Sequence, residues 1–179
     1  MSDTPTDFEL LATIANYIRK DIEQENTAWL ESPFLWVLGL PAGSKGKLGK
    51  HLIYSWCALK GISVERSPDS EADMLINKHR VEIKFSTLWK SGIYKFQQIR
   101  NQNYDYSVCL GISPFEAHCW VISKQILLEN VIGHLGQHTG IKGIETAWFS
   151  VNPISPPIWI KPYGGSLDKA FVVLKSLSK

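Results

Sequence analysis

The sequence has few cysteines, almost no excess of charge of either sign, and no long apolar run, internal repeat or low-complexity tract. Because no run approaches the roughly 20 apolar residues that span a bilayer, we expect no membrane helix. The cysteines, Cys57, Cys109 and Cys119, form no CxxC pair, and their odd number suggests reduced thiols in a cytoplasm. The first residues start acidic and contain no apolar core, so we expect no signal peptide and a cytoplasmic location.

The bulk composition is that of an ordinary globular chain. Its 179 residues are enough for one domain with a core, and 44% of them are hydrophobic and 20% charged. The formal charge of +2 neither requires nor excludes a nucleic-acid partner, because a local basic groove can lie on a nearly neutral chain.

Helical patterns occupy both ends of the chain. Thr6 and Glu9 match a capping box that opens a first helix, and Ser166 is placed to cap the last one. Residues 42–61 predict a further helix with Leu48, Leu52, Trp56 and Leu59 on its inner face, and KQILLENVIG resembles another.

Strand patterns fill the middle of the chain. Short strands are expected at 62–65, 72–76 and 81–85, and YSVCLGIS and AHCWVIS flank a turn as a hairpin. Helices at both ends of a mixed sheet predict an α/β fold. We expect one domain, residues 1–179, which comprises N-terminal helices (1–61), a sheet core (62–124), and C-terminal helices with an irregular Pro- and Gly-rich loop (125–179).

The stretch SPDSEADMLINKHRVEIKF carries charges inside an apolar strand. Side chains alternate along a strand, so Val81, Ile83 and Phe85 share one face while Glu82 and Lys84 share the other. If NKHR is the turn, Ile76 faces Val81, Met74 faces Ile83, and Asp73 faces Lys84. This register predicts that Asp73, Glu82 and Lys84 lie within reach of one another on the polar face.

Two carboxylates beside an ammonium suit the hydrolysis of a phosphodiester. Carboxylate oxygens can hold a hard cation such as Mg²⁺, which polarises a phosphate, and a lysine can orient the attacking water. The alternative is a solvent-exposed strand with alternating Glu and Lys, where an Asp–Lys pair is worth under about 1 kcal/mol. Spacing alone does not separate these two interpretations.

The wider context resembles the PD-(D/E)xK nuclease superfamily. Members carry an acid on one strand and Glu or Asp, any residue and Lys on the next, and Asp73, Glu82 and Lys84 fill those places. The segment 71–124 is similar to small type II restriction endonucleases, mainly through VEIKFSTLW, FQQIRNQNYDY and CLGISP.

The resemblance implies a restriction-endonuclease-like core, a mixed β-sheet flanked by helices, and metal-dependent cleavage of double-stranded DNA. By matching, Asp73 and Glu82 would bind Mg²⁺, with the backbone carbonyl of Ile83 as a further ligand, and Lys84 would assist the attacking water. Mn²⁺ would be able to substitute for Mg²⁺. A homodimer and a protective DNA methyltransferase are the implied partners. The alternatives are a repair or resolvase-type nuclease, a nicking subunit, and a DNA-binding module without catalysis.

The chain departs from the family pattern in one place. Many relatives carry a further Glu on the helix before the hairpin, whereas GKLGKHL places Lys50 there, which puts a second metal site in question. Asp69, in the literal Pro68-Asp69 pair, competes with Asp73 as the first acid. We favour Asp73, which directly precedes the apolar run, because Asp69 after a proline is typical of a turn.

Other residues are candidates for DNA contact. Residues 85–100 mix basic and aromatic side chains; in a generic protein they would form a solvated helix, but beside a nuclease core we favour phosphate contacts. GSKGKLGK lacks the phosphate-loop pattern, so we expect no nucleotide hydrolysis. His134 and His138 have the spacing of zinc ligands on a helix, but the glycines around them disfavour a regular helix. The DNA-contact candidates are Lys47, Ser86, Lys90, Gln98, Arg100 and His138.

Overall fold

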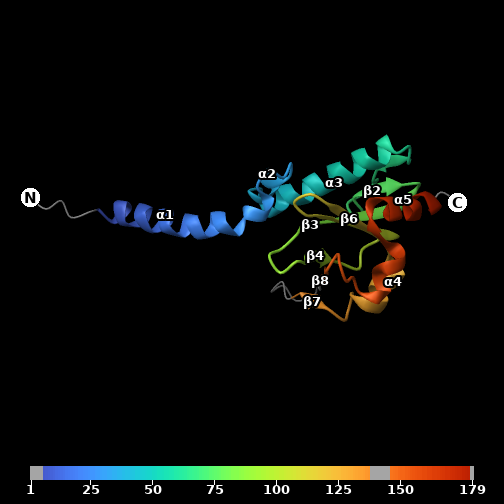
Figure 1. The fold of residues 1–179 in the computed structure, drawn as a ribbon. Helices are drawn as coiled ribbons and strands as arrows, with labels where there is room; N and C mark the ends of the chain where they lie inside the picture. The colour runs from blue at the N-terminus through green and yellow to red at the C-terminus, as the bar shows by residue number, and fades with distance from the viewer. Residues whose placement is uncertain (1–5, 138–145, 178–179) are drawn as a thin grey trace, which may run out of the picture.

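The computed structural model describes residues 6–137 and 146–177, which form a layered α/β fold (Figure 1). The helices are α1 (Asp7–Glu25), α2 (Leu35–Leu38), α3 (Ala42–Leu59), α4 (Lys124–Asn130) and α5 (Leu167–Ser176), with 3₁₀ turns η1 (Thr27–Trp29) and η2 (Ile158–Tyr163). The strands are β1 (Val64–Arg66), β2 (Met74–Ile76), β3 (His79–Thr87), β4 (Tyr94–Ile99), β5 (Tyr106–Ile112), β6 (Ala117–Ser123), β7 (Gly136–Gln137), β8 (Thr146–Val151) and β9 (Gly164–Ser166).

The strands form two sheets. The larger sheet has the order β1-β2-β3-β5-β6-β9, and the smaller has the order β4-β8-β7. In the larger sheet β3 and β5 run parallel, while the other neighbours are antiparallel. The expected α/β class, with a mixed sheet flanked by helices, is therefore confirmed.

Two hydrophobic cores lie on opposite faces of the larger sheet. On one face α3 and α5 pack through Ile53, Cys57, Ala170 and Leu174. On the other face the smaller sheet and α4 pack against it through an aromatic cluster that includes Tyr94, Phe96, Trp120 and Phe149. The three cysteines are free and buried.

Successive side chains of β3 point to opposite faces of the larger sheet, as the alternating pattern predicts. Val81 and Ile83 are buried and Phe85 is packed in the core beneath α3. Glu82 and Lys84 point the other way, toward the smaller sheet, where Lys84 reaches the carbonyl of Gln98 in β4. The polar face of β3 therefore opens into the space between the two sheets.

The predicted hairpin register is wrong by two residues. Ile76 faces His79 and Met74 faces Val81, so the turn is Asn77-Lys78, two residues with φ of 49° and 69°. A two-residue turn with positive φ at both positions matches the right-handed twist of the strands. A shift of two residues keeps every side chain on its predicted face, which is why the alternating pattern could not detect it.

Contacts far along the chain explain why His79 and Arg80 belong to the strand. The His79 ring lies 2.9 Å from the Leu177 carbonyl, and the Arg80 guanidinium pairs with Asp69. Asn77 donates to the Leu174 carbonyl at 3.1 Å, which anchors the turn on α5. Leu174 and Leu177 lie nearly a hundred residues from the hairpin in sequence, so the polar run NKHR resembled a longer turn.

The remaining local predictions are largely confirmed. Thr6 and Glu9 form the capping box, Ser166 caps α5, and β5 and β6 form the expected hairpin. The helix considered for 85–100 is wrong, because these residues form the end of β3, a connection and β4. On α3, Leu52 and Trp56 pack against the core as predicted, beside the buried Gly49, Ile53 and Cys57, whereas Leu59 is 88% exposed and was wrongly placed on the inner face.

Helix α1 extends away from the rest of the protein (Figure 1). Its apolar side chains are largely uncovered: Phe8 is 80% exposed, Leu11 65% and Ile18 49%. Within the described residues, no helix combines the length and the apolar character of a membrane span.

Candidate active site

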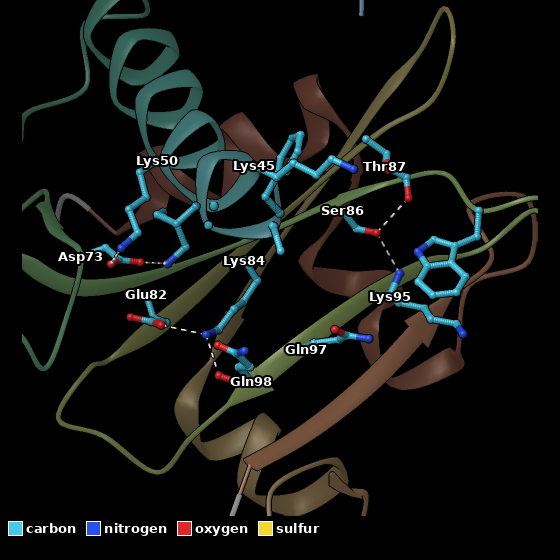
Figure 2. A pocket seen from close by; sticks show the side chains of 16 residues that line it. Lys45, Lys50, Asp73, Glu82, Lys84, Ser86, Thr87, Lys95, Gln97 and Gln98 are labelled. Atoms are coloured by element: carbon cyan, nitrogen blue, oxygen red, sulfur yellow. Dashed lines mark hydrogen bonds and ion pairs between the residues drawn. The ribbon is translucent and has the colours of Figure 1, made fainter. Parts of the chain in front are cut away.

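A cleft of about 480 Å³ lies between the N-terminal half of α3 and the facing strands β3 and β4 (Figure 2). The lining contains all three residues that the sequence singled out for catalysis, together with further basic and amide side chains. Its charged and amide residues are Lys45, Lys50, Asp73, Glu82, Lys84, Lys95, Gln97 and Gln98.

Asp73 lies directly before β2, with a side chain that is 10% exposed. Its Oδ2 accepts a hydrogen bond of 2.8 Å from the backbone N–H of Ile83, so strand β3 itself orients the carboxylate. Its Oδ1 pairs with the ammonium of Lys50 from α3. Both oxygens of the acid therefore have partners, one on the sheet and one on the helix.

Glu82 and Lys84 form an ion pair with each other along β3. The Lys84 Nζ lies 2.8 Å from the Glu82 Oε1, and the two side chains are 12% and 14% exposed. The same Nζ donates to the Gln98 carbonyl at 2.7 Å. The predicted placement of Asp73 opposite Lys84 is wrong: Asp73 pairs with Lys50 of α3, and Lys84 pairs with Glu82.

A bulge in β4 presents the Gln98 carbonyl to the cleft. The pairing of β4 with β8 shifts between Phe96 and Ile99, and Gln98 has φ of 55°. Bulges re-aim groups and are frequent beside active sites. Here the bulge provides the second acceptor that holds the Lys84 ammonium.

Close packing of α3 on β3 brings Lys50 to the site. A Cβ placed on Gly49 would lie 2.5 Å from the Cβ of Phe85, closer than carbon atoms approach. Only glycine allows this approach between helix and strand. Because Lys50 follows Gly49, the contact also determines how near its side chain lies to Asp73.

The cleft is electropositive although it holds two acids. Four lysines and two carboxylates line it, which leaves a net charge of +2. Burial raises the pKa of the Glu82 carboxyl above its ordinary value; Lys84 opposes the rise and Asp73 adds to it. A net positive charge of this kind favours the approach of a polyanion.

The oxygen donors in the cleft fit a divalent cation such as Mg²⁺. Asp73, Glu82 and Ile83 all line the cleft, and Mg²⁺ is commonly held by one or two carboxylates while it keeps several waters. Among the described residues no group of three or more His, Cys, Asp and Glu side chains is placed to hold a metal. Carboxylate and carbonyl oxygens suit a hard cation, whereas zinc sites are built mainly from His and Cys.

The competing acid, Asp69, lies outside the cleft lining. It pairs with Arg80 and accepts from the backbone N–H of Glu71 at 2.9 Å, as in a turn. Hydrogen bonds from Arg80 and Glu71 hold the pKa of Asp69 below its usual range. The catalytic and metal-binding roles of Asp73, Glu82, Lys84 and Ile83 remain predictions.

The candidates for DNA contact divide into two groups. Ser86 and Gln98 line the cleft, although the Ser86 side chain is buried and its Oγ accepts from the Lys95 N–H at 3.0 Å. Lys47, Lys90 and Arg100 are not part of its lining, and His138 lies outside the described residues. The contact roles remain predictions for both groups.

Sequence reasoning missed two features of the cleft. Lys50 was noted as the position that lacks an acid, but nothing local to GKLGKHL indicates that it pairs with Asp73. Trp89 was noted only as one of the aromatic residues of 85–100, whereas the Lys95 ammonium lies over its ring, 3.7 Å from the ring centre. The alternation of charged and aromatic residues in 85–100 was the available signal for the second feature.

Comparisons with known proteins leave the family of this chain unassigned. The chain matches no protein-family model and no curated protein. Among solved structures, a bacterial homing endonuclease, I-Ssp6803I, aligns with a TM-score of 0.48 and 13% identity over 75% of this chain and 93% of that one. A likeness at this level carries no argument about function.

Proposed function

We propose that this protein is a Mg²⁺-dependent DNA endonuclease of the type II restriction class. The observation that supports the proposal is the convergence of Asp73, Glu82 and Lys84 in one cleft with a net positive charge. An ordinary surface strand does not account for it, because Glu82 and Lys84 are both less than 15% exposed. A solvated alternation of Glu and Lys would leave both side chains in water.

The proposed reaction is hydrolysis of a phosphodiester bond. Water attacks phosphorus, the bond from phosphorus to the 3′ oxygen breaks, and the 3′ oxygen takes up a proton, which leaves 5′-phosphate and 3′-hydroxyl ends. Asp73, Glu82 and the Ile83 carbonyl would hold the cation, with Mn²⁺ able to replace Mg²⁺. When bound, the cation would supply charge stabilisation and acidify water.

Lys84 would orient the attacking water. Its ammonium has three N–H groups, and two of them are directed at Glu82 and at the Gln98 carbonyl. These two acceptors hold the ammonium in one position, which leaves the third donor for water or a phosphate oxygen. A fixed donor at the reacting centre stabilises developing charge without reorganisation during the reaction.

The wider proposal covers organisation and partners. Residues 1–179 would act as a single nuclease domain, with double-stranded DNA as substrate, a cytoplasmic location and a DNA methyltransferase as the protective partner. A homodimer would cut both strands, and the uncovered apolar face of α1 supports it, since such faces commonly mark contact surfaces.

Plasmid digestion tests the chemistry. We expect the wild-type protein to linearise a plasmid with Mg²⁺ or Mn²⁺ and to be inactive in EDTA. Lys84→Ala should lose at least about two orders of magnitude in rate, the usual contribution of a positioned acid–base or orienting group. Lys169→Ala, an exposed lysine on α5, is the matched control and should cut normally.

The outcomes separate the alternatives. Equal cutting by wild type and Lys84→Ala contradicts the mechanism, and tight binding without cleavage indicates a DNA-binding module. Sequencing of the cut ends distinguishes a restriction enzyme, which leaves one short fixed sequence, from a nicking subunit, which cuts one strand. A preference for branched DNA indicates a resolvase.

A further inference from the structure

The ammonium of Lys95 is held between two tryptophan rings beside the cleft. Its Nζ lies 3.7 Å from the centre of the Trp89 ring and 5.9 Å from the centre of the Trp148 ring. Lys95 belongs to β4, Trp89 to the connection that follows β3, and Trp148 to β8. Three separate segments therefore combine to place one positive charge.

The backbone around this charge is anchored. The Lys95 N–H donates to the Ser86 Oγ at 3.0 Å, and the same Oγ donates to the Thr87 carbonyl at 2.9 Å (Figure 2). The Trp89 N–H donates to the Ile93 carbonyl at 2.9 Å, which closes the connection between β3 and β4. These bonds fix the backbone of Lys95, and the Trp89 ring restricts its side chain, so binding a ligand there costs less conformational entropy.

The charge of Lys95 is not neutralised by the acids of the cleft. Asp73 pairs with Lys50 and Glu82 pairs with Lys84, and no carboxylate in the described part of the chain lies within ion-pair distance of Lys95. The other lysine at this end, Lys45, donates to the Leu38 carbonyl at 3.1 Å. An anion that enters the cleft would therefore meet the Lys95 charge.

The position of Lys95 along β3 separates it from the proposed reaction centre. Glu82, Lys84 and Ser86 lie on one face of β3, and four residues of a strand span about 13 Å. The backbone N–H of Lys95 is hydrogen-bonded to Ser86, at the far end of this row from Glu82, and the Lys95 side chain points away from Glu82 (Figure 2). A phosphate at Lys95 would thus be a different one from the phosphate at the cut.

We propose that Lys95, held by Trp89 and Trp148, is a binding site for a backbone phosphate of the nucleic acid outside the cleaved linkage. The inference rests on the proposed function, because it assumes that nucleic acid occupies the cleft. The ammonium covers the near face of the Trp89 ring, so that ring positions the cation and does not stack on a base from this side. The site contributes affinity and alignment, since phosphate contacts fix register without reading sequence.

The salt dependence of DNA binding tests the proposal directly. Binding of full-length protein to a labelled duplex is followed by fluorescence anisotropy in EDTA, so that no cleavage occurs, over a series of salt concentrations. Each phosphate contact contributes about 0.9 to the slope of log K against log salt. We expect Lys95→Ala to lower the slope by about 0.9 and Lys95→Arg to keep it.

Lys60→Ala is the matched control. The Lys60 ammonium also lies over an aromatic ring, 4.8 Å from the centre of Phe171, but it is not part of the cleft lining. Its loss should leave the slope unchanged. Trp89→Ala should weaken binding several-fold with little change in slope, because the cation remains but loses its support.

The outcomes distinguish this site from the nuclease proposal. If the wild type binds and cuts DNA while Lys95→Ala keeps the wild-type slope, the phosphate site is wrong and the nuclease proposal stands. If the wild type does not bind DNA, both are overturned. Circular dichroism of each variant confirms that a change in slope does not reflect unfolding.

Discussion

The Lys50 ammonium forms an ion pair with the Asp73 Oδ1, joining α3 to the first proposed metal ligand, which lies directly before β2. The side chain of Lys50 is 48% exposed and that of Asp73 is 10% exposed, so the lysine can leave toward solvent while the acid stays in place. A cation that bound Asp73 through Oδ1 would therefore compete with Lys50. In the proposed mechanism this pair would couple metal binding to the release of a side chain.

Removing this competitor should strengthen metal binding. An ion pair with one half-exposed partner is worth at most about 1 kcal/mol, so Lys50→Ala should bind Mn²⁺ up to about fivefold more tightly. Titration calorimetry without DNA measures the change. Lys45→Ala is the control. It also removes one positive charge from the cleft, but the Lys45 ammonium donates to the Leu38 carbonyl, so this variant measures the effect of net charge alone. Equal affinities for the two variants would show that the ion pair does not oppose the metal.

Substitution of Gly49 should destabilise the fold at the point where α3 meets β3. In Gly49→Ala the new methyl carbon would lie 2.5 Å from the Phe85 Cβ, so helix and strand must separate. Overpacking of this kind costs about 1–3 kcal/mol. Gly46→Ala in the same helix meets nothing within 4 Å and should instead stabilise by up to about 1 kcal/mol. Urea unfolding of both variants measures the free energies of unfolding. If both substitutions change this free energy in the same direction, the close contact at Gly49 does not limit stability.

The burial of Glu82 predicts a pH dependence of stability. Because burial raises the pKa of the folded carboxyl above its ordinary value, the folded state binds its proton more tightly than the unfolded state. The resulting stabilisation is fully present below the unfolded pKa and is lost as the pH rises through the folded pKa. Glu82→Gln does not titrate, so the free energy of unfolding of wild type relative to Glu82→Gln should fall as the pH rises above the ordinary range of a carboxyl group.

Chemical denaturation in chelator at several pH values measures this difference. Glu65→Gln, at an exposed glutamate on β1, provides the control and should show a smaller change. If the difference in free energy of unfolding between wild type and Glu82→Gln stays constant across the pH range, burial does not raise the pKa of Glu82.

The apolar face of α1 predicts self-association through this helix. Leu11→Asp or Ile18→Asp should yield a monomer in sedimentation equilibrium, where the wild type should have twice the 20.2 kDa mass of the chain. Burying such side chains supplies about 1.5–3 kcal/mol each, which a charge would remove. Leu59→Asp changes a leucine that is 88% exposed on α3 and should leave the mass unchanged. A wild-type monomer at micromolar concentration would contradict the dimer.

The faces of β3 were predictable because side-chain alternation is a local property. Val81, Ile83 and Phe85 had to lie together wherever the strand was placed, and Glu82 and Lys84 had to oppose them. The capping of α1 and α5 was equally local, since each cap joins residues three apart. These features place two of the three proposed catalytic side chains on one face before any tertiary contact is known.

The partners of those side chains depended on tertiary structure. The register of the hairpin follows from contacts of His79 and Asn77 with α5, nearly a hundred residues away. The ion pair between Lys50 and Asp73 requires α3 to pack closely on β3 at Gly49. The position of the Lys84 ammonium requires the bulge at Gln98, whose carbonyl accepts its hydrogen bond.

Alternation along a strand determines which face a residue occupies, and a shift of two residues leaves that face unchanged. The sequence by itself therefore determined the α/β class, the capped helices and the polar face that carries Glu82 and Lys84. Only the packing of distant segments decided which acid lies in the cleft and which lysine neutralises it. The physical reason is that ion pairs form between neighbours in space, and spacing along the chain does not specify those neighbours.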